Sequence, residues 1–98
     1  MIIKNKSKER IVRVERAEAE GLLYEYRLLV KESTKLTSYG LPLYSISVEM
    51  TDECGVKSSF TLNEAFVEAE KAFHFFDKLV ENLATPIDLP YVFEDDYN

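Results

Sequence analysis

The side chains best suited to covalent or acid–base chemistry are a single cysteine and a single histidine, Cys54 and His74. A nucleophilic cysteine needs a base or a positive environment that favours its thiolate. Cys54 instead follows two acidic residues, Asp52 and Glu53, whose negative charge disfavours the thiolate. The histidine is twenty residues away. We therefore interpret Cys54 as a turn residue and expect no nucleophilic catalysis.

The residues around His74 have part of the spacing of a metal site. Glu70 precedes it by four residues, which places both side chains on one face of a helix. Two ligands are too few for zinc, which takes three or four protein ligands. A di-iron helix would need the glutamate at the position that Lys71 occupies. We expect an exposed ion pair among Glu70, His74 and Lys78, and no metal or other cofactor.

The carboxylate pairs and the glycines also lack the arrangement of an active site. Glu64 with Glu68, and the acids at 94–96, lie close together in the sequence, but acid–base work would require burial to separate their pKa values. The three glycines are isolated, so the chain has no glycine-rich phosphate loop. We predict no catalytic residue and no enzymatic activity.

Apolar spacing defines the element that would carry His74. Asn63 is the expected cap of an amphipathic helix of about 20 residues, about 30 Å long, that Pro86 ends. Nine apolar residues between 65 and 83 repeat at seven-residue steps and form its buried stripe. They are Ala65, Phe66, Ala69, Ala72, Phe73, Phe76, Leu79, Val80 and Leu83.

Before this helix, apolar and polar residues alternate with the two-residue period of β-strands. The alternating segments are 12–15, 22–31, 44–51 and 56–62, with turns at 18–21 and 52–55 and a loop over 32–42. A helix over residues 8–20 is the alternative for the first segment, because alanine and glutamate favour helix. We predict an α+β fold: a four-stranded antiparallel β-meander with one long amphipathic helix packed on one face.

The end of the chain predicts a short C-terminal helix or an irregular tail. Leu89, Val92 and Phe93 recur at helical spacing, and Asp88 is the expected cap. The acids at 94–96 oppose a helix, since they place negative charge at the negative end of its dipole.

Composition and charge set the class of protein. We assign residues 9–98 to a single domain and the lysine-rich residues 1–8 to a flexible basic arm. The net charge of −6 divides into +3 over residues 1–35 and −9 over residues 36–98. The acidic body repels nucleic acid and anionic lipid. The lone cysteine, with no signal-peptide core and no membrane-spanning apolar run, indicates a cytoplasmic protein.

Three features of residues 39–97 carry a family resemblance. Tyr39-Gly40 precedes an alternating strand, an amphipathic helix follows, and the chain closes with TPI-x-L-x-x-V-x-E-D from Thr85 to Asp95. In these features the chain resembles a small bacterial domain family of unknown function. The resemblance implies a bacterial cytoplasmic setting and brings no activity, cofactor or catalytic residue.

Several surfaces remain for a protein partner. Leu23 and Leu29 fall on the open, polar face of the sheet, which Arg13 flanks. Val67 and Phe75 point away from the helix stripe, and Tyr91 and Phe93 belong to the tail. The full set of expected contacts is Leu23, Leu29, Val67, Phe75, Tyr91 and Phe93.

We expect a protein-interaction module or homo-oligomer that binds through the helix rim, the tail or an unpaired sheet edge. No small-molecule substrate is evident, and no membrane is involved. The alternative function is a nucleic-acid-binding accessory protein that uses the basic N-terminal segment.

Overall fold

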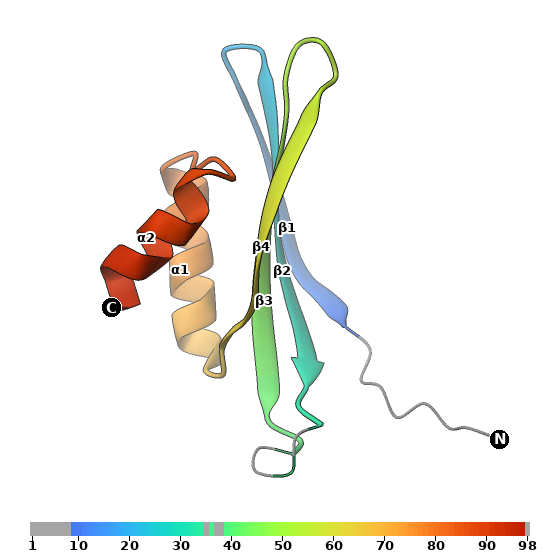
Figure 1. The fold of residues 1–98 in the computed structure, drawn as a ribbon, viewed down its shortest axis with the longest axis vertical. Coiled ribbons are helices and arrows are strands. Elements are labelled where there is room, and N and C mark those ends of the chain that lie inside the picture. The colour runs from blue at the N-terminus through green and yellow to red at the C-terminus, as the bar shows by residue number, and fades with distance from the viewer. Residues whose placement is uncertain (1–8, 35, 37–38, 98) are drawn as a thin grey trace, which may run out of the picture.

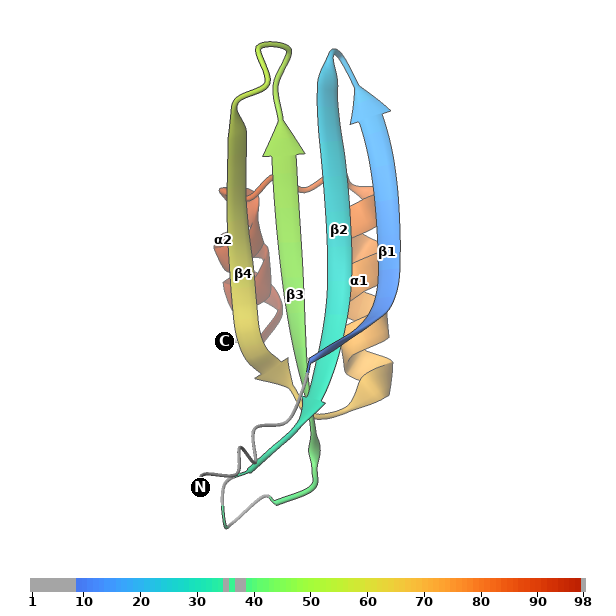
Figure 2. The ribbon, with the colours of Figure 1, turned by 90° about the vertical axis from the view of Figure 1, so that its right-hand side faces the viewer.

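The computed structural model describes residues 9–34, 36 and 39–97, and folds them into two layers (Figures 1 and 2). One layer is a sheet in the order β1-β2-β3-β4, with every neighbouring pair antiparallel. Both helices cover the same face of it. The elements are β1 (Arg10–Ala19), β2 (Leu22–Glu32), β3 (Pro42–Thr51), β4 (Lys57–Phe66), α1 (Ala69–Glu81) and α2 (Asp88–Tyr97).

This architecture confirms the predicted α+β meander with a short C-terminal helix. Residues 10–19 form a strand, so the alternative helix over 8–20 is wrong. These residues form a strand because they pair along β2, from Arg10 opposite Val30 to Ala19 opposite Leu22, as the edge of the sheet. The arm expected at residues 1–8 lies outside the described residues.

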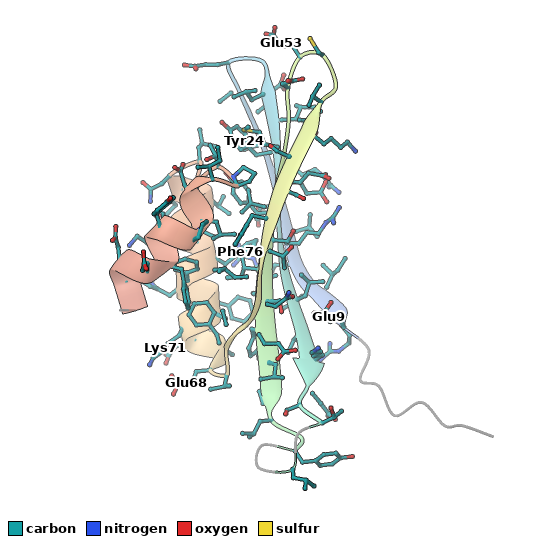
Figure 3. All side chains as sticks on the ribbon, in the orientation of Figure 1. Glu9, Tyr24, Glu53, Glu68, Lys71 and Phe76 are labelled. Carbon is teal, nitrogen blue, oxygen red and sulfur yellow. The ribbon has the colours of Figure 1, made fainter. Side chains whose placement is uncertain are left out.

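The core lies between the sheet and the helices, where Phe76 of α1 points at the sheet (Figure 3). Tyr26 and Leu28 of β2 and Ile46 and Val48 of β3 are completely buried. Of the three phenylalanines in the predicted stripe, Phe66 and Phe76 are buried and Phe73 is half-buried.

A bulge in β1 changes which residues face the helices. The pairing with β2 shifts between Ile11 and Arg13, so Val12 is an extra residue in the ladder. A one-residue slip turns the following side chains to the opposite face. Arg13 therefore lies on the helix side, 2.9 Å from a carboxylate oxygen of Asp77 and 5.0 Å from the ring centre of Phe76. The prediction that Arg13 flanks the open face is wrong for this reason.

The first helix begins later than predicted, because β4 continues to Phe66. The Glu64 N–H donates to Ser45 Oγ at 2.9 Å, and Phe66 still pairs with Tyr44 of β3. Asn63 therefore belongs to the strand and caps no helix. The residue at the N-cap is Glu68, whose side chain makes no capping hydrogen bond. With 13 residues, α1 is about 20 Å long, against about 33 Å for a ten-residue strand.

Two local motifs turn the chain between the helices. Leu83 adopts a left-handed φ of 50°, and its N–H donates to the Val80 carbonyl while that of Ala84 donates to the Leu79 carbonyl. These two bonds form the Schellman ending of a helix.

A capping box then starts α2. The Thr85 N–H donates to the Asp88 carboxylate at 3.1 Å, and the Asp88 N–H donates to Thr85 Oγ1 at 3.2 Å. Thr85 is therefore the cap, and Asp88 is its reciprocal partner rather than the cap predicted. Pro86 occupies the first turn, where its missing N–H costs nothing.

Candidate protein-interaction site

The residues considered for catalysis and metal binding lie in a turn and in a contact between the two helices. Cys54 is exposed in the β3–β4 turn, where its N–H donates to Asp52 Oδ1 at 2.9 Å. Lys78 pairs with Asp96 of α2 at 2.7 Å, which fastens the two helices together. Lys78 therefore pairs with Asp96 of α2 and not, as predicted, with Glu70 and His74. Within the described ranges, no three His, Cys, Asp or Glu side chains gather to hold a metal ion.

Tyr26 is a titratable group in the core, and its role is structural. Its hydroxyl is buried and donates to the Ala84 carbonyl at 2.9 Å. Burial, helped by Tyr24 and Asp88, raises the pKa of Tyr26 to about 12. The phenol is therefore neutral at physiological pH and anchors the helix–helix corner to the sheet.

The open face of the sheet pairs several of its own charges. Arg27 and Arg16 both contact the carboxylate of Glu25, at 2.6 Å and 3.3 Å. The hydrogen bond from Arg27 has the largest effect, and together with the contact from Arg16 it holds the pKa of Glu25 below its usual value. On this face Leu23 is 51% exposed and Leu29 is half-buried. Because the two leucines are separated by this charged network, they form no continuous apolar patch.

The helix rim differs from the prediction in one important residue. Phe75 is completely buried, because α2 folds back over it and the Phe93 ring meets it edge-on at 5.8 Å. Its assignment as an exposed contact is wrong. Phe93 is half-buried and also packs against Phe66 at 5.6 Å. Val67 and Tyr91 are exposed, at 52% and 64%.

The outer edges of the sheet differ sharply from each other. The edge strand β1 is bulged and charged at five of its ten positions, Arg10, Arg13, Glu15, Arg16 and Glu18. Bulges and charges are the usual means by which proteins block edge-to-edge pairing. In the described part of the chain, β4 pairs with β3 alone, and it carries no charge between Lys57 and Glu64. Its own bulge lies near its end, between Leu62 and Phe66, so residues 57–62 pair regularly with β3.

Phe60 is the large side chain on this open edge. It faces the helix side, paired with Val48, yet it is 40% exposed. The helices end below the hairpin turns, so the upper part of the sheet projects beyond them (Figure 1). In Figure 2, β4 forms the rim of the sheet and α2 lies in the layer behind it.

Sequence reasoning included an unpaired edge among the candidate surfaces but did not identify β4 or Phe60. The signal was present in the run of uncharged residues at 58–63. It was obscured because the helix predicted from Asn63 was long enough to cover Phe60.

A family model covering residues 5–97 matches the whole meander and both helices. The chain belongs to DUF6514, a family of unknown function. The match confirms the resemblance to a family of unknown function over residues 39–97, and it also covers β1 and β2. No curated protein and no solved structure matches the chain significantly.

Two further observations bear on the alternative partners. No helix among the described residues is both long enough and apolar enough to cross a membrane. In the basic N-terminal segment, Arg13 contacts Asp77 and Glu15, and Arg16 contacts Glu25. These arginines are therefore committed to carboxylates of the domain itself.

Proposed function

We propose that this chain is a small, non-catalytic protein-binding module that pairs an extended protein segment with the outer edge of β4. The observation that carries the proposal is the contrast in charge between the edges: β1 is charged at five of its ten positions, whereas residues 58–62 of β4 are uncharged and pair regularly with β3. An unblocked edge offers a row of backbone donors and acceptors to another strand.

The side chains of this edge suit strand addition. Ser59 and Thr61 are short, exposed hydroxyl residues on the open face, so a strand can approach closely. Phe60 supplies an apolar contact on the other face. Main-chain hydrogen bonds would provide the affinity, and the alternating side chains would provide the selectivity.

We also propose a bacterial cytoplasmic setting. The resemblance at residues 85–95 supports it, as does Cys54, an exposed lone thiol suited to a reducing compartment. The acidic balance over residues 36–98 disfavours nucleic acid as the partner.

Site-specific photo-crosslinking in cells tests this proposal. Ser59 and Arg16 occupy one row of the open face at opposite edges, linked through Glu25 and Glu49. A photoreactive residue at Ser59 should give adducts with a protein segment, and Thr61→Lys should lower the yield of these adducts. A photoreactive residue at Arg16 should give no such adducts. Equal adducts from both positions, or none from Ser59, would overturn the proposal.

A further inference from the structure

We infer that the strand added to β4 is β4 of a second copy, antiparallel to the first about a two-fold axis at Phe60. The inference rests on the proposed function and names its partner. The two four-stranded sheets would become one continuous sheet of eight strands. A two-fold axis requires a self-complementary surface, and residues 58–62 of β4 have that property in their lack of charge and in their side-chain sizes.

The charges of β4 select the antiparallel arrangement. Its two charged residues are Lys57 at the start and Glu64 near the end. With Phe60 on the axis, Lys57 of one copy lies opposite Asn63 of the second copy, beside the bulge that ends the regular part of β4. Glu64 is already paired with Lys31 across the sheet at 2.8 Å, so Lys57 is the charge of β4 that decides the arrangement. A parallel arrangement in register would place like charges together, which disfavours pairing.

The side chains between these charges also match. Residues opposite each other in this register have numbers that sum to an even value, so both helix layers stay on the same side of the joint sheet. Phe60 faces Phe60 of the second copy, and two half-exposed rings become mutually covered. On the open face, Ser59 lies opposite Thr61, a pairing of short hydroxyl side chains.

A matched pair of double variants tests the partner and the register together. In S59K/T61K, each new lysine lies opposite a lysine of the second copy, whereas in S59K/T61E each lies opposite a glutamate. Sedimentation over a range of concentrations should show a dimer for the unmodified chain. One added strand pair buries less than the standard interface of about 1,600 Å², so we expect a weak dimer.

We expect S59K/T61K to weaken the dimer about tenfold or more, and S59K/T61E to restore it. The lysine pair lowers the net negative charge, so a loss of association cannot come from general repulsion. Circular dichroism checks that each variant folds.

A monomer at all concentrations, or a dimer insensitive to S59K/T61K, would overturn the inference. Failure of S59K/T61E to restore the dimer would overturn the register. If the unmodified chain is monomeric while Ser59 crosslinks to another protein, this inference fails and the proposed function stands. If Ser59 gives no adduct at all, both fail.

Discussion

The hydroxyl of Tyr26 in β2 donates a 2.9 Å hydrogen bond to the carbonyl oxygen of Ala84, in the corner between the two helices. This contact joins residues 58 positions apart and sets the height of α2 on the sheet. Burial of the same hydroxyl raises the pKa of Tyr26 to about 12.

Alkaline pH should therefore destabilise the fold through Tyr26. In the unfolded chain the phenol ionises near pH 10, while in the folded chain its pKa is about 12. The stabilisation is complete below pH 10 and is lost as the pH rises to about 12, by about 2 kcal/mol. Urea unfolding between pH 8 and 12 measures this loss. Tyr26→Phe should cost about 1–2 kcal/mol at neutral pH and reduce the alkaline loss.

Tyr91→Phe is the control for this experiment, because Tyr91 is exposed. It should leave both the neutral stability and the alkaline loss unchanged. An alkaline loss of the same size in Tyr26→Phe would show that another group is responsible.

The β1–β2 turn offers a stabilising substitution. Glu20 and Gly21 both have positive φ, 53° and 82°, the signature of a type I′ hairpin turn. Glutamate is strained in this conformation, whereas asparagine tolerates it. Glu20→Asn should raise the free energy of unfolding by about 1 kcal/mol, measured by urea denaturation. Glu20→Val, which is β-branched, should lower it; if both variants lower it equally, the turn assignment is wrong.

The capping box predicts a local loss of stability in α2. Thr85→Ala removes the acceptor for the Asp88 N–H and should cost about 1 kcal/mol. Ile87→Ala, in the same turn but 75% exposed, should change stability by less than about 0.5 kcal/mol. Thermal unfolding of dilute protein compares the two, and equal losses would argue against a capping role for Thr85.

Phe75 provides a test that separates core packing from partner binding. Because its ring is completely buried between α1 and α2, Phe75→Ala should destabilise the domain by about 3–5 kcal/mol. Phe75→Leu should lose less, since it keeps most of the volume. Chemical denaturation measures both. A stable Phe75→Ala protein with altered association would instead support a role for Phe75 in binding.

The strands and hairpin turns were predictable because their signals are local. Tyr44 to Met50 alternate strictly, and residues 52–55 have turn composition. The start of α1 was not predictable from the seven-residue repeat, because Phe66 fits that repeat from the strand side. What holds it in β4 is the bond between Glu64 and Ser45, a contact across 19 residues that no local pattern reveals.

The candidate site required the same long-range information. The meander order alone predicts that the first and last strands are edges. The bulge at Val12, which moves Arg13 across the sheet, and the exposure of Phe60 on the β4 edge appear only once the strands are paired and the helices are in place. Phe75 was misassigned because the return of α2, and with it Phe93, depends on a corner held by Tyr26.

Amide hydrogen exchange along both sheet edges, followed from micromolar to millimolar protein, tests the central claim most directly. If β4 of one copy pairs with β4 of another, alternate amides in residues 58–62 should exchange more slowly as the concentration rises, while those on the outer edge of β1 should not change. Exchange in β4 that is independent of concentration, or equal slowing at both edges, would contradict the account.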